Sequence, residues 1–268
     1  FVLQPNKELV KKYSAISNKI KIILNKNKLF YEYKPVHIHF TTGRTANATP
    51  IFYTAHDLQK LEESGRRMVD MLNMPTNDIV VNAFPYAPHL AFWQTFYAIK
   101  EANLLSLHTG GGKTLGTDKI IKAIENMKAT CLVGMPGYIY HLIRTAKEQK
   151  NNLSSLNLVI FGGERVPAGL RDKIKNDLIS MGSKAPRILS TYAFTEGKCA
   201  WVECKEESGY HLYPDFEFIE IVDKNNERVG EGEKGEIVYT SLDWRGSVFL
   251  RYKTGDITKG LYYEKCSC

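Results

Sequence analysis

The stretch LVIFGGE, Leu158–Glu164, carries the pattern on which the fold prediction depends. Its four apolar residues predict a short buried strand, and the two glycines that follow mark the end of that strand. In sheets of parallel strands, ligands bind beyond the carboxyl ends of the strands. The FGGE turn therefore stands where a ligand is expected to bind.

Strands and helices alternate on both sides of this stretch. The pattern predicts strands at residues 36–40, 79–83, 130–134, 158–161 and 187–190, and helices from residue 54 to Pro75, in the second half of 84–102, and at 117–128, 138–149 and 167–181. The helix at 117–128 is expected to be capped, and Thr54-Ala55-His56-Asp57 resembles a capping box with Asp in the acidic place. This alternation is typical of an α/β fold with a largely parallel sheet and flanking helices.

The pattern changes after about residue 210, where apolar alternation predicts strands at 216–222, 235–242 and 247–252 without helices. We expect three parts: a basic N-terminal helical segment over residues 1–40, an α/β body over 41–210, and a smaller β-rich subdomain over 211–268.

The composition is that of a globular protein, with 43% hydrophobic and 24% charged residues among 268. No apolar run approaches the roughly 18 residues that a membrane helix needs, and the chain opens without a charged-then-apolar leader. We therefore expect a cytoplasmic protein without a membrane partner. Both ends look cut, as in a piece of a longer polypeptide.

Most of the net charge of +7 comes from the lysines of residues 1–40. A nucleic-acid-binding protein usually shows its basic stripe on the folded body. We expect the run KKYSAISNKIKIILNKNK to form a solvated surface helix, and binding of an anionic partner through these lysines stays the alternative.

The run HTGGGKTLG, His108–Gly116, has some features of a Walker loop. That loop needs a glycine five residues before its Gly-Lys pair, and Leu107 stands there instead. A glycine-rich turn between a strand and a helix is the simpler interpretation.

The run TTGRTANAT, Thr41–Thr49, follows one predicted strand and leads into another. It offers hydroxyls, a glycine that lets the backbone approach a ligand, and a cationic fork for phosphate: Thr41, Thr42, Thr45, Gly43 and Arg44. Phosphate binding and a solvent-exposed turn both fit these residues.

Two later segments share this chemistry. TYAFTE, Thr191–Glu196, follows a predicted strand and combines an aromatic ring, a hydroxyl and a carboxylate. The triplet that ends at Asp256 closes the β-rich part with a carboxylate suited to sugar hydroxyls. Each segment is weak evidence alone, and their order and spacing make the pattern specific.

Taken in order, TTGRTANAT, FGGE, TYAFTE, GYHLYPDFEFIEIVD, GEKGEIVYTSL and LRYKTGD resemble the adenylate-forming acyl-CoA ligases, and in particular the phenylacetate–CoA ligase branch. The resemblance implies the large N-terminal domain of an ATP- and Mg²⁺-dependent acid–thiol ligase. A carboxylic acid would attack the α-phosphate of ATP to give acyl-AMP and pyrophosphate, and a thiol, usually coenzyme A, would take the acyl group. An adenylyltransferase, a carrier-protein-loading enzyme and a non-catalytic nucleotide-binding protein stay as alternatives.

The resemblance also implies roles for single residues in the α/β body and beyond it. The loop that holds the β- and γ-phosphates matches Thr41, Thr42, Gly43, Arg44 and Thr45. The adenine site matches Gly162, Gly163, Glu164 and Tyr192. The phosphate-contacting hydroxyl and the Mg²⁺ carboxylate match Thr195 and Glu196, and the acceptor for the ribose hydroxyls matches Asp256.

The chain departs from the family pattern in the phosphate loop and after Tyr192. Ala46 and Ala48 replace a glycine and a proline, Arg44 replaces the usual threonine, and Ala193 replaces a glycine. In this family a C-terminal lid that contributes a lysine follows the TGD segment, and the sequence stops before it. We therefore predict that residues 1–268 alone bind adenine nucleotide but turn over poorly.

A second group of residues has the composition of a metal site. Cys204, His211, Cys266 and Cys268 offer three thiolates and one imidazole, which suit a closed structural zinc site, and some members of the similar branch carry a comparable set. Unrelated thiols near the chain end are the alternative.

Other histidines and cysteines have simpler interpretations. His37 and His39 share one face of a predicted strand, and packing there is favoured over metal binding because no third ligand is evident. Cys131 lies in an apolar strand and is expected in the core. Cys199 has no evident histidine partner and is not expected to be a nucleophile.

The acid pocket is expected between the aromatic segment FPYAPHLAFW and the end of the FGGE strand. Candidate lining residues are Tyr86, His89, Phe92, Trp93 and Tyr138. Core packing is the alternative for these rings, and a pocket lined by them would suit an aryl or medium apolar acid. The expected partners are this acid, ATP or AMP, and coenzyme A or a carrier protein, with a homodimer as the assembly considered.

Overall fold

The computed structural model describes residues 2–3, 31–41, 48–167 and 169–268. The predicted basic helix and residues 42–47 of the phosphate loop lie outside this range. Two compact units divide the chain. We call Leu61–Ala193 with Lys198–His211 the parallel-sheet unit, and Phe1–Lys60 with Phe194–Gly197 and Leu212–Cys268 the small-sheet unit.

The parallel-sheet unit is built on a six-stranded sheet of order β5-β4-β6-β7-β8-β9. Neighbouring strands from β5 to β8 are parallel, and β9 pairs antiparallel with the end of β8. The strands are β4 (Ile79–Asn82), β5 (Leu105–His108), β6 (Cys131–Gly134), β7 (Leu158–Phe161), β8 (Arg187–Ala193) and β9 (Ala200–Val202). The predicted α/β class with a largely parallel sheet is confirmed.

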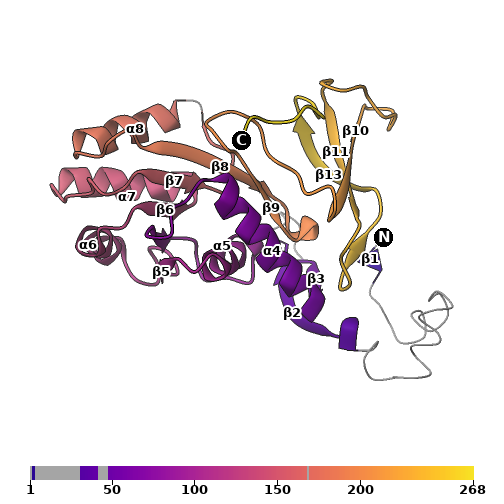
Figure 1. Cartoon of the computed structure of the whole chain (residues 1–268), viewed down its shortest axis with the longest axis horizontal. Helices are drawn as coiled ribbons and strands as arrows, with labels where there is room; N and C mark the ends of the chain where they lie inside the picture. The colour runs from indigo at the N-terminus through magenta and orange to yellow at the C-terminus, as the bar shows by residue number, and fades with distance from the viewer. Residues whose placement is uncertain (1, 4–30, 42–47, 168) are drawn as a thin grey trace. The chain divides into compact units, whose positions relative to one another are not determined.

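Helices α6 (Thr117–Met127), α7 (Pro136–Glu148) and α8 (Leu170–Ser180) form one layer of this unit, with α7 between the other two (Figure 1). Their apolar faces share a core with alternate strand residues such as Leu132, Val159 and Ile188, all fully buried. Because successive strand residues point to opposite faces, the residues between them face the other side of the sheet. The apolar runs of β6 and β7 reflect this burial on both faces.

Helices α4 (Ala55–Met71) and α5 (Leu90–Glu101) approach each other closely. A Cβ added at Gly65 of α4 would lie 2.6 Å from the Cα of Ala98 in α5. Glycine at this position therefore allows the two helix backbones to come into contact.

The small-sheet unit contains an antiparallel sheet of order β10-β11-β13, formed by Glu217–Val222, Gly235–Ser241 and Tyr252–Thr258. The hairpin of β2 (Pro35–Phe40) and β3 (Pro50–Thr54) belongs to the same unit, as does the pair of β1 (Val2–Leu3) and β12 (Val248–Phe249). The prediction of a β-rich part without helices after residue 210 is confirmed for these elements.

The predicted capping box at the start of α4 is present. The Thr54 N–H donates to Oδ2 of Asp57 (3.0 Å), and the Asp57 N–H donates to the Thr54 hydroxyl (3.3 Å). The buried Asp57 carboxylate also accepts the backbone N–H groups of Arg245 and Gly246, each at 2.7 Å. One carboxylate thus caps a helix and holds a turn from a distant part of the chain.

Several boundaries differ from the prediction, each for a local reason. α8 begins at Leu170 instead of residue 167, because Gly169 before it is left-handed (φ +71°). α6 was predicted as a capped helix: its N-cap, Gly116, makes no side-chain capping bond, whereas left-handed Lys128 caps its C-terminus through its backbone N–H. The predicted strand at 247–252 is divided by Arg251, which has a positive φ of 45°.

Two strands at the edges of the main sheet were not predicted. β5 reads LSLH and exposes Leu105, and β9 has only the three residues AWV. Among the described residues, no helix combines the length and apolarity needed to cross a membrane.

Candidate nucleotide-binding site

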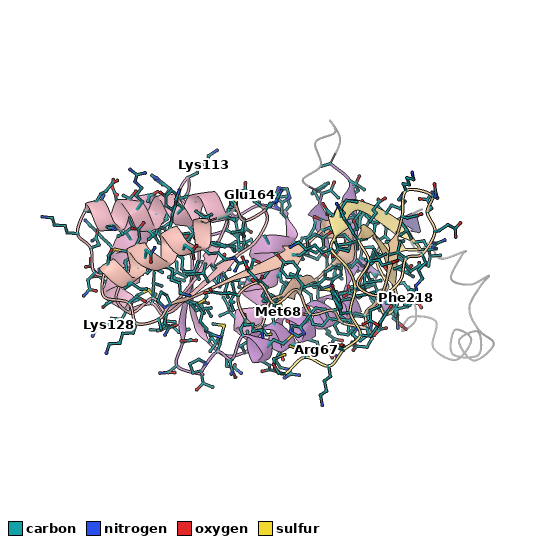
Figure 2. The ribbon with its side chains drawn as sticks, turned by 90° about the horizontal axis from the view of Figure 1, so that it is seen from above. Arg67, Met68, Lys113, Lys128, Glu164 and Phe218 are labelled. Carbon is teal, nitrogen blue, oxygen red and sulfur yellow. The ribbon has the colours of Figure 1, made fainter. Side chains whose placement is uncertain are left out.

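The FGGE turn follows β7 and is shaped by close backbone packing. Gly162 donates its N–H to the carbonyl of Gly134 (3.1 Å), and a Cβ at Gly162 would lie 2.7 Å from Oγ1 of Thr191. Gly163 has φ +82°, a conformation that favours glycine. Glu164 is exposed at the surface, as is Lys113 of the glycine-rich turn (Figure 2). The turn therefore brings bare backbone and a carboxylate to the carboxyl edge of the sheet.

Tyr192 lies near the end of β8 within a group of aromatic rings. Its ring centroid is 5.2 Å from that of Trp201 and 6.1 Å from that of Tyr210. The Tyr210 hydroxyl lies 3.0 Å from the Ser190 hydroxyl, so this ring is tied to the same strand. Tyr192 is half-buried and offers a supported aromatic surface at the predicted adenine site.

A buried ion pair that sequence reasoning missed supports the same end of β8. Arg171 of α8 lies 3.0 Å from the carboxylate of Glu203, and Glu203 accepts the Ser190 N–H at 2.8 Å. Arg171 also donates to the Ser190 hydroxyl (2.9 Å). The partners lie on separate elements, so no local pattern in the sequence could reveal the contact.

In the small-sheet unit, Thr195 and Glu196 lie in the 3₁₀ turn η1 (Thr195–Gly197). The Tyr252 hydroxyl donates to Oε1 of Glu196 at 2.7 Å. Burial raises the pKa of Tyr252 most, and the hydrogen bond to Glu196 and the charges of Glu196 and Asp256 raise it further. The phenol is therefore a stable hydrogen-bond donor to the carboxylate, and Tyr252 is a site residue that was not predicted.

Asp256 is exposed on β13 at a local irregularity of the sheet. Between Lys253 and Ile257 the register against β11 shifts, and Gly255 has φ +81°. The Gly255 N–H donates to Oε1 of Glu236 and the Asp256 N–H donates to the Thr254 hydroxyl, both at 3.1 Å. This bulge orients the TGD segment away from the regular strand pairing.

Of the predicted phosphate loop, the structure describes Thr41. Its N–H donates to the carbonyl of Thr49, and its hydroxyl accepts the Thr49 N–H, both at 3.0 Å. The pair closes the end of the β2–β3 hairpin, which confirms the predicted strands on each side. Thr42, Gly43, Arg44 and Thr45 lie outside the described residues.

The aromatic segment places some of the predicted pocket residues together. The ring centroids of Tyr86 and Trp93 are 5.9 Å apart, and Phe92 packs against both. Tyr86 is 68% exposed, which fits an accessible surface better than a core position. His89 is half-buried and precedes α5 as its N-cap, without a side-chain capping bond.

Tyr138 of α7 lies beside the glycine-rich turn. A Cβ added at Gly112 would come within 2.7 Å of the Tyr138 ring and hydroxyl, so the absent side chain makes room for this phenol. Burial raises the pKa of Tyr138, and the hydrogen bond to Thr117 lowers it in part.

His108 ends β5 beside the aromatic segment and was not predicted as a site residue. Its Nδ1 lies 3.1 Å from the amide nitrogen of Asn82, and its Nε2 lies 3.0 Å from the Ser106 hydroxyl. Since the Asn82 amide oxygen already accepts the Phe84 N–H, the amide nitrogen donates to Nδ1, which leaves the proton on Nε2. Burial lowers the pKa of His108, in accord with a neutral ring.

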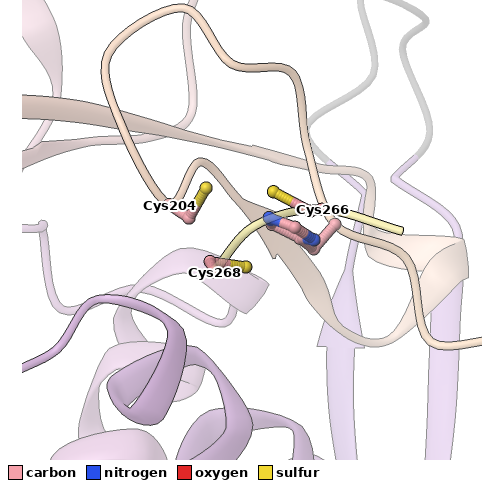
Figure 3. A group of neighbouring side chains, drawn as sticks. Cys204, Cys266 and Cys268 are labelled. Carbon is pink, nitrogen blue, oxygen red and sulfur yellow. The ribbon is translucent and has the colours of Figure 1, made fainter. Parts of the chain in front are cut away.

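The four predicted zinc ligands form one group of neighbouring side chains (Figure 3). The ligand atoms of Cys204, His211, Cys266 and Cys268 all lie within 4.8 Å of one another. Three thiols and one imidazole are a donor set that suits Zn²⁺. The residues present therefore fit this metal in number and chemistry.

The simpler interpretations of the other residues agree with their surroundings. His37 and His39 lie 2.8 Å apart through their Nε2 atoms, and burial lowers the pKa of His37. Both rings pack against Tyr53. Cys131 is fully buried and burial raises its pKa, so its thiol is inert. Cys199 is also buried.

Solved structures define the class of fold. The described chain superposes with a TM-score of 0.72 on 2-hydroxyisobutyryl-CoA ligase in an open conformation with 2-HIB-AMP and CoA, at 22% identity, over 84% of this chain and 48% of that one. The McyG A-PCP structure with phenylalanyl-adenylate gives a TM-score of 0.64 at 17% identity, over 87% and 40% of the two chains. The fold is that of the N-terminal part of adenylate-forming enzymes.

The model of the AMP-binding enzyme family matches residues 18–252, and the chain belongs to that family. It is 26% identical to phenylacetate–coenzyme A ligase of Thermus thermophilus over 237 residues, which are 86% of this chain and 51% of the relative. It is 25% identical to the Escherichia coli enzyme of the same name, over 84% of this chain and 51% of the relative. The chain thus spans about half the length of the curated relatives that it matches.

Proposed function

We propose that the protein is an ATP-dependent ligase that adenylates a carboxylic acid and passes the acyl group to coenzyme A. The arrangement around Tyr252 carries the proposal, because its hydroxyl binds Glu196 and Asp256 lies four positions further along the same strand. We propose complementary tasks for the two carboxylates, Glu196 at a divalent cation and Asp256 at the ribose hydroxyls. Exposed Asp256 is accessible to a ligand.

In the proposed first step, an oxygen of the substrate carboxylate bonds to the α-phosphorus of ATP. The bond from that phosphorus to the bridging oxygen breaks, and pyrophosphate leaves with the electron pair. No proton is transferred, so the protein acts by positioning and by neutralising charge. Thr195 would donate a hydroxyl hydrogen bond to phosphate, and Tyr192 with the FGGE backbone would hold the adenine.

Glu196 is the proposed Mg²⁺ ligand, because a carboxylate oxygen is the donor that this hard cation prefers. Bound Mg²⁺ would supply positive charge to the phosphates. Thr41, Thr42, Gly43, Arg44 and Thr45 are the proposed contacts to the β- and γ-phosphates.

In the proposed second step, the sulfur of coenzyme A bonds to the acyl carbon. The bond from this carbon to the AMP oxygen breaks, AMP leaves with the electron pair, and the thiol proton passes to solvent. The similarity to phenylacetate–coenzyme A ligases supports coenzyme A as acceptor. We place the enzyme in the cytoplasm, where both cosubstrates are available.

The aromatic segment is the proposed acid-binding region. Tyr86, His89, Trp93 and Tyr138 are the proposed lining residues, with Phe92 behind Tyr86 and Trp93. Aromatic rings of this kind favour an acid whose remaining part is aryl or medium-sized and apolar over an acid whose remaining part is charged. The neutral ring of His108 behind Phe92 adds no charge to this region.

We also propose that Cys204, His211, Cys266 and Cys268 bind one structural Zn²⁺. Four protein ligands leave no coordination position open for water, so the ion would stabilise the fold without taking part in the reaction. The close grouping of their ligand atoms supports this proposal.

Pyrophosphate exchange with a panel of carboxylic acids tests the function on the full-length protein. Acid-dependent exchange with formation of a coenzyme A thioester is the expected result. Exchange without a thioester would favour a carrier protein or another acceptor. ATP binding without exchange for any acid would overturn the ligase proposal in favour of a non-catalytic nucleotide-binding role. Residues 1–268 alone are expected to exchange poorly, and robust exchange by them would contradict that expectation.

A further inference from the structure

The hydrogen bond between Tyr252 and Glu196 joins residues 56 positions apart in the sequence. Its length of 2.7 Å lies within the range of an O–H group that donates to a carboxylate. The bond uses Oε1 of Glu196. A carboxylate can accept several bonds, so this one leaves Oε2 with its lone pairs for a cation.

The ring that carries this hydroxyl is itself held in place. Phe249 meets it edge to face at a centroid distance of 5.3 Å, and Phe194 lies nearly parallel to it at 6.4 Å. A tyrosine side chain has few rotatable bonds, and these neighbours limit them further. The phenol oxygen therefore has a defined position, whereas an unrestrained glutamate would sample many rotamers.

We propose that Tyr252 is a positioning residue for Glu196: its hydroxyl binds Oε1 and so fixes the orientation in which the carboxylate meets a divalent cation. The inference rests on the proposed function, since Glu196 is the proposed Mg²⁺ ligand. Pre-orientation matters because each rotamer that Glu196 loses on binding lowers the affinity for the ion.

Tyr252 also belongs to the strand that carries the second carboxylate of the proposed site, Asp256. Asp256 lies four positions further along β13, and its charge acts on the Tyr252 phenol. Tyr252 thus binds the turn that holds Glu196 and begins the strand whose bulge holds Asp256. Tyr252 acts through these carboxylates and needs no contact of its own with substrate.

Tyr239 offers a matched control. Its hydroxyl belongs to the same unit and donates to the backbone carbonyl of Gly197, the residue after Glu196, at 3.4 Å. Its ring packs edge to face on Phe194, as a second aromatic neighbour of the turn. Tyr239→Phe removes a phenol hydroxyl beside the turn that donates to a backbone carbonyl.

The experiment measures binding of Mn²⁺ in the presence of ATP by electron paramagnetic resonance, on full-length wild type, Tyr252→Phe and Tyr239→Phe. Tyr252→Phe is expected to weaken Mn²⁺ binding about 10-fold, the effect of losing one hydrogen bond to a charged group. Tyr239→Phe is expected to change it less than about 2-fold. The Mg²⁺ concentration for half-maximal pyrophosphate exchange should rise more in Tyr252→Phe than in Tyr239→Phe.

A double-mutant cycle separates positioning from general stability. In a Glu196→Gln background, Tyr252→Phe should have no further effect on Mn²⁺ binding, because the two residues act as one unit. An unchanged Mn²⁺ affinity in Tyr252→Phe, or full additivity with Glu196→Gln, would overturn the inference. Mn²⁺ binding needs no acid substrate. The inference therefore stands if the Tyr252 effect appears while exchange fails with every acid, and the ligase function alone is then rejected.

Discussion

The backbone of Gly162 lies so close to Thr191 that a methyl group at Gly162 would come within 2.7 Å of the Thr191 hydroxyl oxygen. The same methyl group would lie 3.1 Å from the ring of Phe84. Thr191 cannot move freely, because its hydroxyl donates to the carbonyl of Phe161 at 3.0 Å. Gly162 of the FGGE turn is therefore packed between Thr191 and Phe84.

Gly162→Ala should lower the free energy of unfolding by about 1–3 kcal/mol, the usual cost of overpacking. Weaker ATP binding should accompany it, because the turn lies at the proposed adenine site. Denaturant titration and a nucleotide-binding assay measure the two effects. Gly137→Ala is the control, since nothing lies within 4 Å of an added Cβ in that helix. Equal stability of the two variants would refute the packing argument.

Gly112→Ala should displace the Tyr138 ring, which lies within 2.7 Å of the added Cβ. If Tyr138 lines the acid pocket, KM for the acid should rise about 10-fold or more, the effect of a misfit of one methyl group. KM for ATP should change little. Steady-state kinetics of the full-length protein with each substrate varied in turn distinguish the two. A rise confined to ATP would show that Tyr138 does not belong to the acid pocket.

The stability of the protein should fall as the pH drops below the ordinary histidine pKa of about 6.5. Burial lowers the pKa of His108 in the folded state, so the unfolded chain takes up the proton first. The stabilising effect is fully present above about pH 6.5 and is lost as the pH falls toward the lower folded pKa.

Unfolding free energies of wild type and His108→Gln, measured at about pH 7.5 and about pH 5.5, test this sign. The wild type should lose more stability between the two pH values than the variant. Some pH dependence should remain in the variant because burial also lowers the pKa of His37. An identical loss of unfolding free energy in wild type and variant would show that His108 does not contribute to the pH dependence.

Protein purified without chelators should contain about one zinc ion per chain. His211→Asn and Cys266→Ser should each lose most of this metal, and a chelator should lower the melting temperature of the wild type. Cys199→Ala should keep the metal, because Cys199 lies outside the group of four ligands. Elemental analysis with less than about half an equivalent in the wild type would refute the site.

The central strands of the fold could be predicted because strands that are buried on both faces are continuous apolar runs in the sequence. β6 and β7 are runs of apolar residues, and the helix between them, α7, shows an apolar stripe. The edge strands could not, because β5 carries an exposed leucine and β9 gains its structure from pairing with β8. Their conformation depends on neighbours and not on local composition.

The candidate site divides in the same way. Glu196 and Asp256 could be singled out, since each stands in a short motif with a chemical rationale. Tyr252 and His108 could not be predicted as site residues, because their hydrogen-bond partners depend on how the strands pair. Tyr252 pairs with Tyr239 of β11 and bonds to Glu196, which lies 56 positions earlier in the chain.

The antiparallel pairing of β8 with β9 limits which insertions and deletions the chain tolerates. The chain returns along β8 through the short connection Phe194–Cys199, which holds Thr195 and Glu196. An insertion or deletion there that shifts the register of β9 by one residue would turn its side chains to the opposite face of the sheet. In a library of single-residue insertions, the surface loop at Asn225 and Asn226 should accept changes, whereas the segment from β8 to β9 should accept almost none.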